Sequence, residues 1–176
     1  TPDSMVWLDL RAEPVVISVP AVDPKRYYSV QMVDGNTFNY GYIGSRATGH
    51  EAGSYLVVGP GWQGETPAGI KQVFRSTTQF GLTIFRTQLF NPEDMPNVVK
   101  VQAGYKAQPL SAYLKQPAPP AAPAIDFPTI NKAMVKTNGM LPGADYFLSH
   151  VSLVFDDRKS QPLMAGAVRR IRCKWA

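Results

Sequence analysis

The feature that most constrains the fold is a series of short apolar segments that fills the first ninety positions. These segments are rich in β-branched and aromatic residues, and Pro, Gly, Asn or Asp bounds each of them, which is the pattern of β-strands. No helical pattern of ten or more residues lies between them. Strands are expected at residues 5–10, 15–19, 26–33, 38–44, 54–58, 73–77 and 81–90. Because a parallel sheet would need crossover helices, we predict a mainly β fold, an antiparallel β-sandwich or barrel.

The segment 26–33 shows how such a strand would be placed. Tyr28, Val30 and Met32 alternate with more polar neighbours and would share one face, so that face can be core and the other half-exposed. The turn-forming sequence of residues 34–36, Asp-Gly-Asn, then predicts a reversal into the next strand.

The pattern changes near residue 91, where a helix is expected. Asn91 suits the N-cap, Pro92 suits the first helical position and two carboxylates follow in the first turn, so we expect a helix over 92–105. Six of the chain's 16 prolines then fall between residues 109 and 128, which predicts an extended connector. Helical patterns return over 129–137 and 142–155. The expected organisation is a β-sandwich domain at 1–107, a Pro-rich connector at 108–128 and a helical segment with a basic tail at 129–176.

The positive charge of the chain is uneven. Residues 1–105 carry 8 Lys and Arg against 9 Asp and Glu, whereas residues 106–176 carry 10 against 4, which together give the net charge of +5. A protein that reads nucleic acid normally carries its basic stripe on the folded domain. We therefore expect no nucleic-acid partner and interpret the basic end as a solvated tail.

The cysteine and histidine content limits the possible cofactors. One cysteine and two histidines exclude the usual zinc and disulfide frameworks, and no metal-binding spacing joins His50 to His150. We expect no metal and no cofactor. No stretch reaches the roughly 18 apolar residues of a membrane span.

Five polar residues are candidates for a ligand-binding site. Asp34, Asn39, Arg46 and Arg86 lie at or near the ends of expected strands and could converge at one rim of a sandwich, where arginine can bind a carboxylate or phosphate through paired hydrogen bonds. His50 lies in a Gly-His-Glu-Ala-Gly loop that could be reactive or a plain polar hairpin. In the alternative interpretation, each of these side chains only satisfies loop backbone or a surface partner. The sequence assigns no catalytic residues.

Several segments resemble, in order and spacing, one bacterial family. They are Trp-Leu-Asp-Leu-Arg-Ala-Glu-Pro-Val-Val at 7–16, Arg-Tyr-Tyr-Ser-Val-Gln-Met-Val-Asp at 26–34, Asn-Tyr-Gly-Tyr-Ile-Gly-Ser-Arg-Ala-Thr-Gly at 39–49, Tyr-Leu-Val-Val-Gly-Pro-Gly-Trp at 55–62, Pro-Ala-Gly at 67–69 and Arg-Thr at 86–87. The chain is thereby similar to the family called domain of unknown function 1254, well over residues 4–110 and loosely to about 171.

The resemblance implies an immunoglobulin-like β-sandwich followed by a small helical region. Family members typically continue into a second β-rich domain, number 1214, and many are exported from bacterial cells. We therefore expect a periplasmic or secreted protein, and a cytoplasmic location is the alternative. The sequence ends where the second domain would begin, so we expect a chain truncated before its partner. The expected partner is that second β-rich domain, or another copy of the chain bound through the helical segment.

Two hypotheses about function follow. In the first, the chain is a non-catalytic module that binds a ligand or cell-envelope component, or serves as a scaffold for a second domain. In the second, it is part of a hydrolase or lyase that acts on an organic acid or polymer, with Asp34, Arg46, His50 and Arg86 as the polar centre. The absence of a nucleophile–base pair in the sequence favours the first hypothesis.

Overall fold

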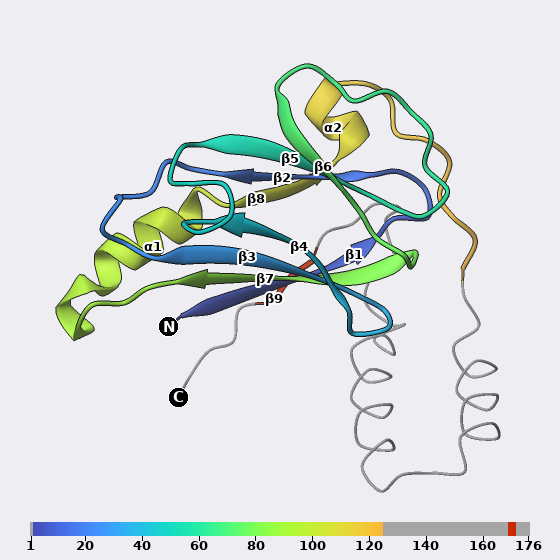
Figure 1. The fold of residues 1–176 in the computed structure, drawn as a ribbon. Helices are drawn as coiled ribbons and strands as arrows, with labels where there is room; N and C mark the ends of the chain where they lie inside the picture. Colours follow the sequence, from blue (N-terminus) through green and yellow to red (C-terminus); the bar gives the residue numbers. More distant parts are fainter. Residues whose placement is uncertain (1, 125–168, 172–176) are drawn as a thin grey trace, which may run out of the picture. The chain divides into compact units, whose positions relative to one another are not determined.

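Two β-sheets stacked face to face form the core of the protein in a computed structural model, which describes residues 2–124 and 169–171 (Figure 1). The strands are β1 (Asp3–Asp9), β2 (Val15–Val19), β3 (Tyr28–Asp34), β4 (Asn39–Gly44), β5 (Gly53–Val58), β6 (Ile70–Arg75), β7 (Phe80–Thr87), β8 (Lys106–Pro109) and β9 (Arg169–Ile171). The helices are η1 (Pro92–Asp94), α1 (Met95–Ala103) and α2 (Leu110–Leu114). Contacts divide the chain into two units, 1–121 with 165–176 and 122–164, and every described element belongs to the first.

The two sheets differ in strand number. Sheet A has the order β4-β3-β7-β1-β9, and sheet B has the order β6-β5-β2-β8. This architecture confirms the prediction of a β-sandwich. All pairs are antiparallel except β5 and β6, which run parallel. Two parallel neighbours cannot be joined by a tight turn, because the chain must first run back to the end of the sheet where β5 began. The long connection over residues 59–69 provides this return before β6 begins.

The core lies between the sheets and follows the alternation expected of half-buried strands. In β3, Tyr28, Val30 and Met32 are fully buried, while the residues between them are partly exposed, as the sequence pattern predicts. Equivalent side chains of the other strands complete the main cluster: Val6, Leu8, Val15, Ile17, Val19, Ile43, Tyr55, Val57, Phe74 and Phe85. Leu10, Val22 and Tyr105, which lie outside the strands, also belong to it.

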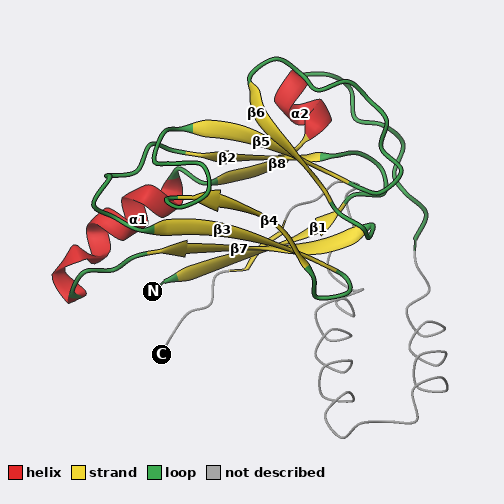
Figure 2. Cartoon of the chain, viewed as in Figure 1, coloured by secondary structure: helices red, strands yellow, loops and turns green. Residues whose placement is uncertain are grey.

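Sheet B is covered on its outer side as well. Val16, Leu56 and Val58 face outward and are buried by a second apolar cluster. Its partly buried members are Trp62, Ile70, Val73, Leu110 and Tyr113. The cover comes from the connection over 59–69 and from α2, which lies above sheet B in Figure 2. Among the described residues, the outer side of sheet A has no comparable cluster, and the polar candidates of the sequence are therefore best sought there.

The helix expected after residue 91 is confirmed over η1 and α1. The Asn91 Oδ1 accepts the Asp94 backbone N–H at 3.0 Å, as an N-cap should. Asp94 itself is buried and forms an ion pair with Arg26, whose Nη1 lies 2.6 Å from Oδ2. This pair joins the helical turn to the start of β3.

The Pro-rich stretch does not begin as an extended connector. Its first two residues end β8, which pairs with β2 in sheet B, and the next five form α2. Prolines tolerate an edge strand when their nitrogen faces away from the ladder, as Pro109 does here, so composition alone was misleading. The division of the chain at residues 107 and 128 stays a prediction.

The C-terminal region contains a strand that was not expected. Residues 169–171 form β9, which adds to the edge of β1 in antiparallel register, with Met5 opposite Ile171. Residues 169–171 belong to the basic end that was interpreted as a solvated tail, and this interpretation was wrong at these positions, because a three-residue strand leaves too short a pattern to detect. The helices expected at 129–137 and 142–155 lie outside the described residues.

Candidate functional site

A polar row crosses the outer face of sheet A at one end. The strand register places Asp3 opposite Arg86, Arg86 opposite Ser29 and Ser29 opposite Gly44. Since side chains opposite one another point to the same face, the row carries a carboxylate, a guanidinium and a hydroxyl side by side. Gly44 leaves the end of the row without a side chain.

A chain of hydrogen bonds joins this row to the β3–β4 hairpin. The Nη1 of Arg86 donates to the Oε1 of Gln31 at 2.5 Å, and the Nε2 of Gln31 donates to the Oδ1 of Asn39 at 2.6 Å. The Nε of Arg86 also lies 3.8 Å from the Oδ2 of Asp3. Four strands of sheet A therefore contribute to one surface network, called here the outer-face network (Asp3, Arg86, Gln31 and Asn39).

The polarity of this network follows from the chemistry of arginine. A guanidinium has five N–H donors and no acceptor, so the oxygen of Gln31 must face Arg86. The amide nitrogen of Gln31 must then face Asn39 and meet its oxygen. The amide nitrogen of Asn39 has no acceptor within the network, so this exposed end of the network presents donors, while the Asp3 carboxylate at the other end is an acceptor.

Arg46 lies at the end of the same face. Its guanidinium carbon is 5.5 Å from the centre of the Tyr27 ring, a cation–π distance. Tyr27 precedes β3, its side chain is exposed, and its backbone N–H is held by the Gln88 side chain at 2.8 Å. A second cation and an aromatic ring therefore flank the polar row where β3 begins and β7 ends.

The opposite part of the outer face is apolar. The register aligns Met5 with Ile84, and Trp7 with Leu82 and then Val33. All five side chains are only partly buried. Tyr42, opposite Gln31 and 45% exposed, lies where the apolar and polar parts meet. The outer face thus changes from polar to apolar along the strands.

Asp34 does not join this surface. Its side chain is only 5% exposed, and the backbone N–H groups of Asn36 and Phe38 donate to its Oδ1 at 2.9 Å. The hydroxyl of Thr77 donates to its other oxygen. The Thr77 hydrogen bond, aided by these backbone donors and opposed by burial, lowers the pKa of Asp34 below its ordinary value. The carboxylate closes the β3–β4 turn and links it to the connection between β6 and β7.

His50 is separated from Asp34 by the length of β3. Its ring centre lies 6.2 Å from that of Tyr28, at the start of β3, and its backbone carbonyl accepts the Val22 N–H. Asp34 ends the same seven-residue strand, so the two groups are roughly 20 Å apart at the usual rise per residue. The structure therefore does not bring these two candidates into one acid–base centre.

Of the five candidates, Asn39 and Arg86 belong to one network and Arg46 lies at the edge of the same face, while Asp34 and His50 lie elsewhere. Gln31, which links the first two, was missed because it looked like an ordinary outward residue of a strand. Only knowledge of which strands are neighbours could have identified it. A ligand-binding role for the five candidates stays a prediction.

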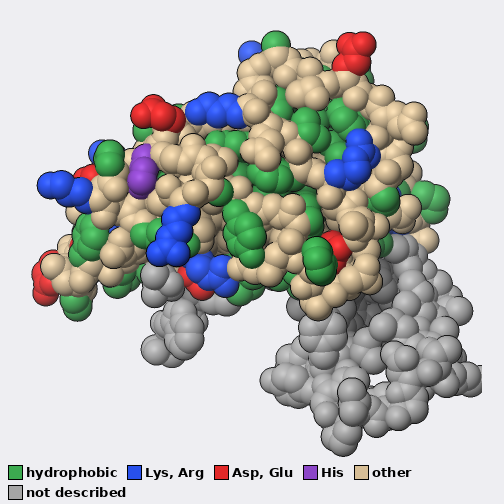
Figure 3. Space-filling model, in the orientation of Figure 1, with side chains coloured by type: hydrophobic (Ala, Val, Ile, Leu, Met, Phe, Trp, Pro, Cys, Tyr) green, Lys and Arg blue, Asp and Glu red, His purple; other side chains and the backbone are tan. Residues whose placement is uncertain are grey.

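The described residues contain no group of three or more His, Cys, Asp or Glu side chains placed to hold a metal ion. Within the same residues, no helix has both the length and the apolar character needed to cross a bilayer. Basic side chains are spread over several separate places in the view of Figure 3, without one continuous patch.

The fold defines a two-sheet β-sandwich module whose sheet A carries a polar network beside an apolar area on its outer face. Residues 1–109 match the family described as "Protein of unknown function (DUF1254)", and the chain belongs to that family. The expected resemblance to this family is confirmed. None of the curated proteins matches the chain.

A solved structure shares this fold. The crystal structure of the VPA0106 protein from Vibrio parahaemolyticus, a structural genomics target, is 30% identical in sequence, with a TM-score of 0.66. The match covers 69% of this chain and 30% of that chain. The part of the Vibrio chain that the match spans is therefore less than a third of its length.

Proposed function

We propose that this chain is a non-catalytic binding module of an exported protein, and that the outer-face network binds a ligand that carries a carboxylate. The observation that supports the proposal is the fixed polarity of the network. Arg86 gives one of its five N–H donors to Gln31, and Asn39 presents its amide donors outward. The Asn39 end of the network, which presents donors, favours a ligand that offers acceptors there.

The neighbours of the network favour a ring-bearing anion. Tyr42 and Tyr27 are exposed on the same side of sheet A, and Arg46 adds a second guanidinium. Planar arginines bind carboxylates through paired hydrogen bonds, and exposed aromatic rings stack on flat or sugar-like groups. A carboxylated sugar unit, such as cell-envelope polymers contain, combines both properties.

The test uses galacturonic acid oligomers and their methyl esters, which have the same rings without the charge. We expect isothermal titration calorimetry to detect binding of the acid form, with a dissociation constant raised at least tenfold by Arg86→Ala and by the ester. Lys100→Ala removes one positive charge from the exposed side of α1 and serves as the matched control. Equal affinity of acid and ester, or of Arg86→Ala and the parent chain, would contradict the proposal.

The apolar part of the same face favours a second role, as a scaffold for another domain. Trp7 and Leu82 are neighbours on it and are only partly buried. Apolar surface of this kind commonly marks an interface. In the full-length protein, Leu82→Lys should then lower the Tm, while in the isolated module its effect should be small. An equal decrease in Tm in the full-length protein and in the isolated module would contradict the scaffold role.

The location outside the cytoplasm rests on the family resemblance alone. Fractionation of cells that express the full-length protein at native level would test it. Recovery in the periplasm or medium is expected, and recovery with a cytoplasmic marker would overturn it.

A further inference from the structure

On one side of the sandwich, the part of the chain described leaves the edge of β8 unpaired. Sheet A has five strands and sheet B has four. At the same side of the molecule, the edge of β1 is covered by β9, whereas β8 pairs only with β2. An uncovered edge exposes backbone groups that can pair with another strand.

The register shows which backbone groups face outward. Leu110 N–H donates to the carbonyl of Pro14, at the end of the β2–β8 ladder. In an antiparallel pair such bonded positions alternate, so Gln108 and Lys106 also bond towards β2. The N–H and the C=O of Ala107, between them, must therefore point to the open edge.

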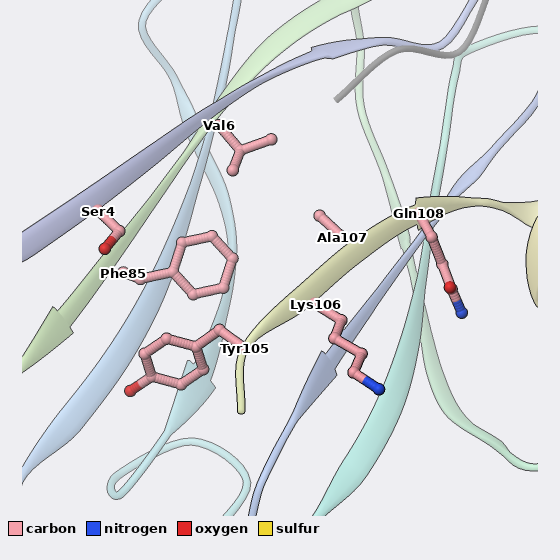
Figure 4. Close-up of a pocket in the computed structure, with 7 residues that line it drawn as sticks. All are labelled: Ser4, Val6, Phe85, Tyr105, Lys106, Ala107 and Gln108. Atoms are coloured by element: carbon pink, nitrogen blue, oxygen red, sulfur yellow. The ribbon is translucent and has the colours of Figure 1, made fainter. Parts of the chain in front are cut away.

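A pocket lies directly beside this edge. It has a volume of about 270 Å³ and is lined by β8 and by parts of both sheets. The lining residues are Ser4, Val6, Phe85, Tyr105, Lys106, Ala107 and Gln108. Figure 4 shows the rings of Phe85 and Tyr105 side by side, with the side chain of Ala107 directed towards Val6, while those of Lys106 and Gln108 are directed away. The pocket thus opens onto the apolar core between the sheets.

The size of the pocket indicates what it can accept. Pockets for cofactors and drug-sized ligands usually measure about 300–1,000 Å³, so this one suits a smaller group. An apolar side chain from a strand placed next to β8 would point the same way as Ala107, towards the core. Its neighbours in that strand would lie on the outer side beside Lys106, which is exposed and positively charged.

We propose that the open edge of β8 binds an extended peptide segment of another protein as a fifth strand of sheet B. One apolar side chain of the segment occupies the pocket, and an adjacent acidic residue faces Lys106. In this kind of strand addition, backbone hydrogen bonds provide affinity and pockets for alternate side chains provide specificity. The addition of β9 to β1 shows that the opposite sheet accepts a short strand in the same manner.

The test uses a blocked peptide in which valine alternates with glutamate. If valine lies opposite Ala107, the valine amides face β8 and the glutamate amides face solvent. We expect N-methylation of the valine amides to weaken binding at least tenfold and N-methylation of the glutamate amides to change it less than twofold. Both measurements use the unaltered full chain, so no variant needs to fold.

Two measurements locate the contact. Hydrogen exchange of the Ala107 amide should slow on addition of the peptide, and Ala107→Pro, which removes that donor, should abolish binding. Lys106→Glu should weaken binding of the acidic peptide and strengthen that of a lysine–valine peptide.

Four results would overturn the proposal: equal effects of the two methylation patterns, protection at the edges of β4 or β6 instead of β8, an Ala107 amide already protected in the free chain, or self-association of the chain that the peptide displaces. The last result would identify a second copy as the occupant. Because these readouts do not involve galacturonate binding, failure of either proposal leaves the other intact.

Discussion

Arg26 and Asp94 form a bidentate ion pair that joins the start of β3 to the helical turn that precedes α1. The Nη1 and Nη2 of Arg26 lie 2.6 and 2.7 Å from the two carboxylate oxygens. Arg26 also donates to the Gln88 carbonyl and its guanidinium stacks 4.6 Å from the Phe90 ring centre. The hydrogen bonds to Asp94, opposed by burial, raise the pKa of Arg26 above its ordinary value, while those same bonds hold the pKa of Asp94 well below its own.

Breaking this pair from one side should destabilise the fold. Arg26→Met leaves the Asp94 carboxylate buried without its cation, so we expect the Tm to fall by roughly 5–15 °C. The double variant Arg26→Met, Asp94→Leu removes both charges and should recover part of that loss. Thermal unfolding followed by circular dichroism measures both. A double variant less stable than Arg26→Met would contradict the explanation.

Stability should decrease in acid through Asp34 and Asp94. Both have a folded pKa below the unfolded value of about 3.9, so their contribution is complete above that value and is lost as the pH falls through the lower folded pKa. Urea unfolding between pH 6 and pH 2 should show a constant free energy of unfolding above about pH 5 and a decrease below about pH 4. The decrease should be shallower in Asp34→Asn. An unchanged slope in that variant would show that Asp34 contributes nothing to the acid response.

Stability should also decrease in strong alkali through Tyr28. Burial, with smaller contributions from Tyr55 and Tyr105, raises its pKa to about 12, and its hydroxyl donates to the Gly49 carbonyl at 3.1 Å. A folded pKa above the unfolded value of about 10 gives a contribution that is complete below pH 10 and is lost as the pH rises through 12. Unfolding measured from pH 9 to pH 12 should show this decrease, and Tyr28→Phe should reduce it. The same decrease in Tyr28→Phe would assign the effect to other groups.

Gly44 should tolerate no side chain. Its φ is +135°, and a Cβ would lie 2.3 Å from the Tyr28 carbonyl oxygen. Gly44→Ala should therefore cost at least about 2 kcal/mol of unfolding free energy, since both the backbone conformation and the contact oppose it. Gly61→Ala is the matched control, because a Cβ there meets nothing within 4 Å. Chemical denaturation compares the two, and equal stability of both variants would contradict the strain at Gly44.

The sequence predicts the seven strands of the first ninety residues because their signals are local. Alternation and turn residues identify β3 and its hairpin without knowledge of any partner strand. The parallel pair of β5 and β6, and the additions of β8 and β9, depend on pairing between distant segments, and three or four residues carry too little pattern to reveal it.

The candidate site was predictable only in part, for the same reason. Residue type and position at strand ends identified Arg86 and Asn39, which the structure links through Gln31. Residue type and position could not distinguish the role of Asp34 from the roles of Arg86 and Asn39, because a carboxylate that closes a turn and one that faces a ligand look alike in sequence. Register across sheet A, which the sequence does not specify, makes that distinction.

The pairing of β1 with β7 has a consequence for biosynthesis. Asp9 lies opposite Phe80, so the first strand of the sandwich cannot find its neighbour until more than seventy further residues have been made. At about 5–20 residues per second, a ribosome needs roughly 4–15 s for that distance. During this interval Trp7 and Leu8 remain on a nascent chain without a sheet to cover them, which makes the N-terminal strand a natural client for chaperones that act during translation.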